Sequence, residues 1–185
     1  MILKELFFVL WFFAPAGLSN MSAFLASKIP LLKRLNQPVD ARLKFRGKRI
    51  FGSHKTIRGF IFGTVMAIIG VSIEVLLYTL IPFLHTNIPI NYSAINPLLL
   101  GFLLGFGALT GDAIKSFFKR QLSIPPGKSW VPFDQIDYIL GGMVFTYFYI
   151  PLSAAQYVVL FAVWFLVHLV INFYGYILKL KRQPI

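Results

Sequence analysis

Residues 59–80 read GFIFGTVMAIIGVSIEVLLYTL, and this stretch decides the fold class because it is long and apolar enough to cross a bilayer. A helix that spans a membrane needs about 20 predominantly apolar residues. Four other segments have the same character, so the sequence predicts an all-α integral membrane protein with five transmembrane helices. The predicted spans are Leu6–Ser27, Gly59–Leu80, Pro97–Phe118, Tyr138–Leu152 and Ala155–Leu178.

The composition supports a single membrane-embedded domain over residues 1–185. Hydrophobic residues make up 57% of the chain and the mean hydropathy is +0.74, whereas charged residues make up only 13%. Soluble domains carry about twice that share of charge. The segments between the spans are too short for a second domain. The chain has no cysteine, which excludes disulfides and thiolate chemistry.

Basic residues gather in three hydrophilic segments, and this asymmetry predicts the topology. Of the 18 Lys and Arg residues only Lys4 lies elsewhere, and the Ile81–Pro97 connection has none. Because basic loops flank spans on the cytoplasmic side, we expect a multi-pass protein of the cell membrane with its N-terminus outside. Loops 30–58 and 119–134 and the C-terminus are then cytoplasmic. The basic segments are Lys28–Arg58, Lys115–Lys128 and Lys179–Arg182.

The net charge of +12 implies anionic partners. A basic surface beside a membrane favours anionic lipid headgroups or small anionic substrates. Nucleic acid is not expected, because the basic segments adjoin the spans and no nucleic-acid-binding motif is present. A small anion transporter or channel is a non-enzymatic alternative, which would need no paired carboxylates.

The densest polar pattern lies at the end of the third predicted span. Five residues recur there at i, i+3, i+4, i+7 and i+8, so on a helix they line one face. An ionised group near membrane depth is costly unless it is paired or bound to a metal, which favours a functional stripe over a solvated helix end. The stripe consists of Asp112, Lys115, Ser116, Lys119 and Arg120.

Two further acids, Asp134 and Asp137, stand three residues apart at the start of the fourth predicted span. Acidic residues at a helix start often act as caps, and one of the two fits that interpretation. With Asp112 on the preceding span, the pair fits a magnesium site better. Mg²⁺ prefers oxygen ligands and uses one or two carboxylates together with substrate phosphate. We therefore predict Mg²⁺ ligands at Asp112, Asp134 and Asp137.

Glycines and cations before the second span suit phosphate binding. Lys55, Thr56 and Arg58 open that span within the run Arg46–Gly59, where glycines permit close backbone approach and cations neutralise phosphate. For any single Lys or Arg of this run, the alternative to phosphate binding is that its charge only fixes the cytoplasmic side of the loop. Lys128 lies in a Gly-Lys-Ser triplet that does not complete a P-loop, because position 122 is Leu rather than Gly.

Four other polar residues have two interpretations each. Asn20 either reaches a nucleotide or bonds a neighbouring helix. Asp40 either touches the nucleotide or pairs with the cations beside it. Glu74 and His168 lie inside spans, where ionisable residues are candidates for function; we expect them to form a structural pair away from the acids.

These segments together resemble the phosphatidate cytidylyltransferase family. Its signature is similar to Gly111-Asp112, Lys115-Ser116, Lys119-Arg120, Pro126-Gly127 and Asp134-x-x-Asp137, and a second block is similar to Lys55-Thr56-x-x-Gly59. The small size and five predicted spans resemble the archaeal branch, the CDP-archaeol synthases, over essentially the whole chain. Two departures from the bacterial pattern affect phosphate contacts. Lys128-Ser129-Trp130 stands in place of His-Gly-Gly, and Gln135-Ile136 stands in place of Arg-x between the last two acids.

The resemblance implies a Mg²⁺-dependent CTP:lipid-phosphate cytidylyltransferase of membrane phospholipid biosynthesis. Its lipid substrate would be an unsaturated isoprenoid glyceryl-ether phosphate, and its products a CDP-activated lipid and pyrophosphate. Lys119 and Arg120 join the three acids as expected catalytic residues. A rival CDP-lipid-handling enzyme, the CDP-alcohol phosphotransferase, has an Asp-Gly-x-x-Ala-Arg pattern that is absent here. The expected nucleotide contacts are Lys55, Thr56, Arg58, Lys115, Ser116, Lys128, Asn20 and Asp40.

Overall fold

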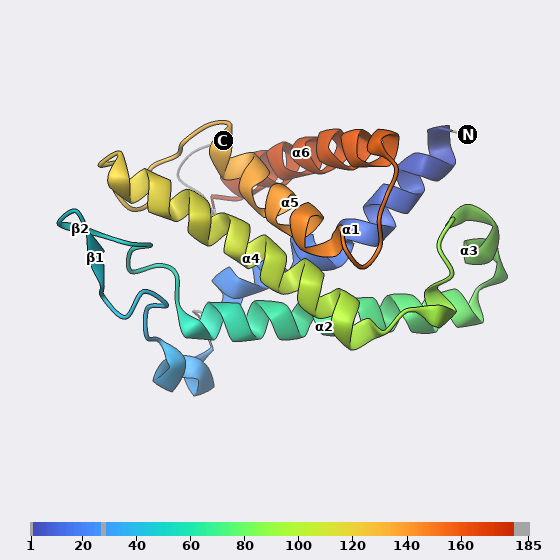
Figure 1. Cartoon of the computed structure of the whole chain (residues 1–185), viewed down its shortest axis with the longest axis horizontal. Helices are drawn as coiled ribbons and strands as arrows, with labels where there is room; N and C mark the ends of the chain where they lie inside the picture. Colours follow the sequence, from blue (N-terminus) through green and yellow to red (C-terminus); the bar gives the residue numbers. More distant parts are fainter. Residues whose placement is uncertain (1, 27–28, 180–185) are drawn as a thin grey trace.

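Helices form nearly all of the regular structure in the computed structural model, which describes residues 2–26 and 29–179 (Figure 1). Two short strands pair antiparallel, with Lys44 opposite Arg49, in the connection between the first two long helices. The long helices are α1 (Ile2–Leu25), α2 (Ile57–Leu80), α4 (Pro97–Gln121), α5 (Phe133–Thr146) and α6 (Ala154–Ile177). The short elements are η2 (Pro30–Leu35), β1 (Lys44–Phe45), β2 (Lys48–Arg49), α3 (Pro82–Asn87) and η3 (Tyr92–Ala94).

Four predicted spans are confirmed as helices of membrane-crossing length, because α1, α2, α4 and α6 are each long and apolar enough. α1 begins at Ile2 rather than Leu6, since the polar side chains of its first turn find partners. Lys4 Nζ donates to the Thr86 carbonyl in α3 at 2.9 Å. Glu5 accepts from the side-chain amide of Gln156 in α6 at 3.4 Å. Of the residues named in the predictions, Ser27, Lys28, Lys181 and Arg182 lie outside the described residues.

The fourth predicted span differs from the prediction. α5 runs over 14 residues from Phe133 to Thr146, instead of from Tyr138 to Leu152. It starts earlier because α4 supplies lysine partners for the acid in its first turn, Asp134. At 1.5 Å per residue α5 is about 21 Å long, less than the ~30 Å of a bilayer core. The fifth crossing therefore stays a prediction.

The connections sort to two ends of the bundle (Figure 1). The strands and the α4–α5 connection lie at one end, whereas α3 and the start of α1 lie at the opposite end. α4 and α6 run in the same direction, so the chain between them returns along the bundle through α5 and residues 147–153. This arrangement groups loops 30–58 and 119–134 at one end, as the charge pattern predicts.

The predicted orientation can be tested with single cysteines, because the chain has none of its own. Ser53 and Ser93 are both exposed, and they flank α2 at its two ends. Ser53→Cys should react with an impermeant thiol reagent from the cytoplasmic side of oriented vesicles, and Ser93→Cys from the outside. Labelling of both from the same side would contradict a membrane-crossing α2.

α1 lies at the centre of the packing. It contacts α2, α4, α5 and α6, and its Phe8, Phe12 and Phe13 are fully buried. Helices in a bilayer associate through close packing and interhelical hydrogen bonds, because lipid tails are as apolar as the helices. Both occur here: Phe13 packs edge-on against Trp164, whose indole N–H donates to the Val9 carbonyl at 2.9 Å. α1 and α6 are thereby held together.

The predicted pairing of Glu74 with His168 is wrong. Within the described residues no contact joins α2 to α6, and Glu74 is buried without an ion-pair partner. The ring of His168 packs against that of Tyr138, with 5.3 Å between centroids. His168 therefore packs on the residue that follows Asp137 in α5, and not on α2. The spacing of the two residues along the chain did not indicate which helix faces meet.

Candidate active site

Two glycines let α4 and α5 cross in close contact. A Cβ atom on Gly111 would overlap the carbonyl oxygen of Asp137, and a Cβ atom on Gly141 would overlap the carbonyl oxygen of Gly107. Small residues permit this backbone-to-backbone approach between membrane helices. The crossing brings Asp112, which follows Gly111 on α4, next to Asp137 on α5.

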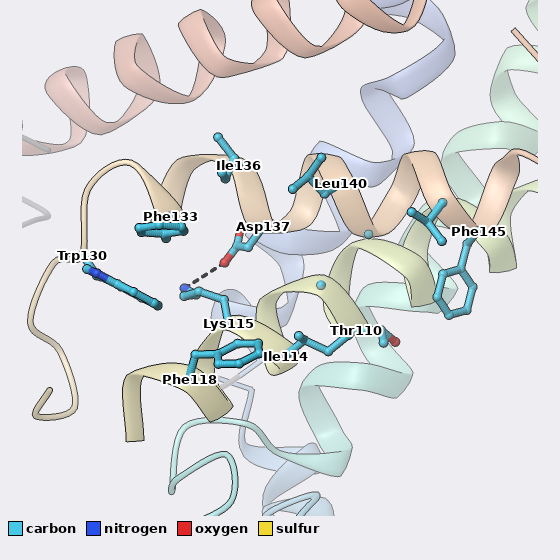
Figure 2. Close-up of a pocket in the computed structure, with 13 residues that line it drawn as sticks. Thr110, Ile114, Lys115, Phe118, Trp130, Phe133, Ile136, Asp137, Leu140 and Phe145 are labelled. Carbon is cyan, nitrogen blue, oxygen red and sulfur yellow. Dashed lines mark ion pairs between the residues drawn. The ribbon is translucent and has the colours of Figure 1, made fainter. Parts of the chain in front are cut away.

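The Lys115 ammonium lies where the three predicted acids meet, and Figure 2 shows it pointing across to α5. Its nitrogen is 3.1 Å from Asp112 Oδ1, 2.7 Å from Asp134 Oδ1 and 2.8 Å from Asp137 Oδ2. All four side chains are largely buried. Opposite charges attract strongly in such surroundings, and an unpaired buried charge is costly. The acids from two helices do converge, as their spacing predicted.

Two further lysines extend this network. Lys119 Nζ donates to both carboxylate oxygens of Asp134, at 3.0 and 2.9 Å. Lys55, from the connection before α2, forms an ion pair with Asp112. The Trp130 backbone N–H also donates to Asp134, at 2.6 Å. Three lysines and three acids therefore tie α4, α5 and the connection before α2 together at one point.

A divalent cation would find suitable ligands here. Carboxylate oxygens from Asp112, Asp134 and Asp137 are the donors that Mg²⁺ prefers. The central place among them is taken by the Lys115 ammonium, and over residues 2–26 and 29–179 no group of three His, Cys, Asp or Glu side chains is arranged to hold a metal ion. A metal bound by these acids therefore requires the Lys115 side chain to turn away.

A polar pocket of about 270 Å³ lies beside the network. Residues 51–55 form one wall, and the predicted polar stripe of α4 forms another. A concave, cation-lined pocket of this kind suits the phosphates of a small ligand. The prediction of one helix face is confirmed, since four members of the stripe share the pocket. They are Lys115, Ser116, Lys119 and Arg120, with Pro126 and Gly127 beside them.

The other predicted nucleotide contacts are not among the described residues that line this pocket. The Thr56 hydroxyl caps α2 by accepting from the backbone N–H three residues on, at 3.2 Å. Lys128 has an exposed side chain, and its carbonyl accepts from Lys119. Asn20 is half-buried on α1. Arg58 is only 6% exposed, and its Nε has no hydrogen-bond partner in the part of the chain that the structure describes.

Asp40 lies behind the wall formed by residues 51–55. Its side chain is fully buried, and its oxygens accept hydrogen bonds from Arg49 and from three backbone N–H groups. Burial raises the pKa of the carboxyl, but these hydrogen bonds outweigh burial and lower the pKa of Asp40 to about 2. The protein itself therefore supplies the partners of this carboxylate.

An apolar groove of about 520 Å³ runs between α4 and α5 (Figure 2). Its polar lining side chains are Thr110, Lys115 and Asp137, together with the Trp130 indole, which stacks on the Phe133 ring with centroids 4.2 Å apart. Other lining side chains, such as those of residues 114 and 144, are exposed, so the groove opens sideways toward the bilayer. Lys115 lines both the groove and the polar pocket.

Sequence reasoning missed two parts of this site. Gly52, Ser53 and His54 line the polar pocket, and the glycines and cations of the run Arg46–Gly59 are the signal that points to them. The apolar groove has no sequence signal of its own. Its lining residues look like ordinary lipid-facing residues until α4 and α5 lie side by side.

Comparisons with known proteins identify the family of this chain. The family model described as CarS-like, CDP-archaeol synthase, matches residues 2–185. The CDP-archaeol synthase of Thermococcus gammatolerans is 34% identical over 98% of each chain, and that of Methanocaldococcus jannaschii is 31% identical over 98% of each chain. A solved structure of an intramembrane enzyme for archaeal membrane lipids biosynthesis shares the fold, with a TM-score of 0.68 and 24% identity over 88% of this chain and 91% of the other. The chain therefore belongs to the CarS-like family of CDP-archaeol synthases.

Proposed function

We propose that this protein transfers the cytidylyl group of CTP to the phosphate of an unsaturated isoprenoid glyceryl-ether phosphate, giving a CDP-activated lipid and pyrophosphate. The observation that carries the proposal is that Lys115 borders a polar pocket on one side and an apolar groove on the other. A nucleoside triphosphate and a lipid tail need opposite surroundings, yet their phosphates must meet. The relatives named above are CDP-archaeol synthases, which supports the same reaction.

In the proposed reaction an oxygen of the lipid phosphate attacks the α-phosphorus of CTP. The bond from that phosphorus to the bridging oxygen breaks, and pyrophosphate leaves. The attacking phosphate is already ionised at neutral pH, so the step needs no general base. Two anions must approach each other, so catalysis consists mainly of positioning and charge neutralisation. We assign this neutralisation to Lys55, Lys119 and Arg120, which line the pocket, together with Arg58 and Lys128.

We assign Asp112, Asp134 and Asp137 as ligands of a Mg²⁺ ion that binds with CTP. When bound, the ion would neutralise the phosphates and help pyrophosphate to leave. The same acids hold the Lys115 ammonium, so metal binding would require this side chain to turn away, where it could contact phosphate in the pocket that it lines. Ser116, on the pocket wall, is the proposed neutral contact to the nucleotide. Thr56 and Asn20 are assigned weaker contacts at its edge.

The test is turnover by the purified protein. Incubation with radiolabelled CTP, Mg²⁺ and isoprenoid glyceryl-ether phosphates should move the label into the organic phase and release pyrophosphate. An anion transporter would instead move labelled CTP across a vesicle membrane without converting it. Absence of labelled lipid with every lipid phosphate offered would overturn the proposal.

Filling the groove should weaken lipid binding selectively. Leu140→Trp places a large ring among the side chains that line the groove, so a lipid tail loses contact there. We expect the KM for the lipid phosphate to rise roughly tenfold, the factor that corresponds to about 1.4 kcal/mol. The KM for CTP should not change. Val158→Trp, at an exposed position on α6, is the matched control, and equal effects of the two variants would contradict the assignment.

A further inference from the structure

The connection before α2 folds into a compact cap over the polar pocket. We use the word cap for residues 37–57. Its two ends are joined by backbone hydrogen bonds. The Val39 N–H donates to the Lys55 carbonyl at 2.8 Å, and the Ile57 N–H donates to the Gln37 carbonyl at 2.9 Å. Its far end is fastened separately, because Lys48 Nζ donates to the Gln121 carbonyl at the end of α4, at 2.6 Å. The cap is therefore a closed loop that is attached to α4 through Lys48, and its Lys55 pairs with Asp112 of the same helix.

Asp40 organises the inside of this cap. Its carboxylate accepts five hydrogen bonds, which is more than any other side chain of the cap receives among the described contacts. Arg49 donates twice from its guanidinium, a bidentate geometry that fixes both partners. The remaining donors are backbone N–H groups of Arg42 at 3.0 Å, Phe51 at 3.1 Å and Gly52 at 3.1 Å.

The last two of these donors belong to the wall of the polar pocket. Residues 51–55 form that wall, so Asp40 holds the wall by its first two backbone N–H groups. Gly52 has φ +91°, and a Cβ atom there would lie 3.6 Å from Arg120 Cδ on the opposite side of the pocket. The wall thus closely approaches a predicted catalytic residue, and a small shift of its backbone changes the width of the pocket.

We infer that Asp40 and Arg49 form a positioning pair that sets the affinity of the polar pocket for the nucleotide, acting through the backbone of residues 51–55. The inference rests on the proposed function. Asp40 does not bind the nucleotide directly, because its side chain is fully buried and its oxygens are engaged within the cap. Positively charged Arg49 keeps the carboxylate ionised and in place. Among the described residues, none from the cap lines the apolar groove between α4 and α5, so we do not expect this pair to control lipid binding.

Asp40→Asn tests the inference, because it keeps the size of the side chain and replaces one acceptor oxygen by an amide donor. In either orientation of the amide, its NH₂ group faces N–H donors of the backbone or of the guanidinium, so hydrogen bonds are lost. We expect the KM for CTP to rise about tenfold or more, since hydrogen bonds to a charged group are among the stronger ones. Turnover at saturating CTP should stay within about twofold, and the KM for the lipid phosphate should not change.

Arg49→Gln is the second variant, and Lys44→Ala is the matched control. Arg49→Gln should raise the KM for CTP in the same way, and the double variant should be no worse than the more affected single one, because both remove the same pair. Lys44 lies exposed on β1 of the same cap, so its loss should have no effect. Hydrogen exchange of residues 51–55 should become faster in both variants of the pair and stay unchanged in the control.

The possible outcomes separate this inference from the proposed function. An active wild-type protein whose KM for CTP and hydrogen exchange are unaffected by Asp40→Asn would overturn the inference and leave the function standing. A uniform loss of turnover with both KM values unchanged would also overturn it, since Asp40 would then act on the chemical step or on folding. A wild-type protein that does not convert CTP would remove both.

Discussion

Asparagine in place of Asp134 or Asp137 is expected to remove most turnover while the protein still inserts into the membrane. The amide keeps the size of the side chain but removes the charge that holds Lys115 and that we assign to Mg²⁺ binding. An electrostatic contact at a reacting centre is worth about 3–4 kcal/mol, so kcat should fall by roughly 10²–10³. Asp112→Asn should behave alike. Turnover and Mg²⁺-dependent CTP binding of the purified variants are the measurements.

Glu74→Gln is the matched control for this series. It makes the same kind of change at a buried acid of α2 that has an unpartnered oxygen and lies outside the site, so most turnover should survive. Near-full activity of Asp134→Asn and Asp137→Asn would mean that the two acids are helix caps. Loss of turnover with unchanged Mg²⁺-dependent CTP binding would leave the acids as partners of Lys115 and remove the metal assignment.

Alanine in place of Gly141 is expected to damage both stability and turnover. Its methyl group would overlap the Gly107 carbonyl oxygen, and since the obstacle is backbone, α4 and α5 must move apart. Overpacking of this kind commonly costs about 1–3 kcal/mol. The displacement also separates Asp112 from Asp137. We therefore expect a loss of kcat that is larger than the loss of folded protein can account for. Thermal unfolding in detergent and kcat are the measurements.

Gly70→Ala is the control for the glycine experiment. A Cβ atom at Gly70 on α2 would lie 3.4 Å from the nearest side-chain atoms of α1, which is an ordinary contact. Alanine favours a helix over glycine by up to about 1 kcal/mol, so this variant should be at least as stable as the wild type. Similar losses in Gly70→Ala and Gly141→Ala would show that the close crossing of α4 and α5 is not the cause.

Local features of the chain made much of the fold predictable. A span of apolar residues has only one way to satisfy its backbone in lipid, which is to form a helix. For that reason the bounds of α2, α4 and α6 are close to those predicted from hydropathy. The exception is α5, whose first turn is too polar for a hydropathy pattern to include. Its acid, Asp134, is accommodated by lysines of another helix, and no local pattern contains that information.

The site divides in the same way. The sequence alone determined the polar stripe of α4 and the grouping of its cations, because helical periodicity and charge are properties of consecutive residues. Three features were decided only by the tertiary structure. The Lys115 ammonium occupies the space among the three acids, and Asp40 turns inward to hold the cap. An apolar groove also adjoins the polar pocket. These features depend on distances between helices, and those distances follow from which glycines allow backbones to touch and which buried charges find partners.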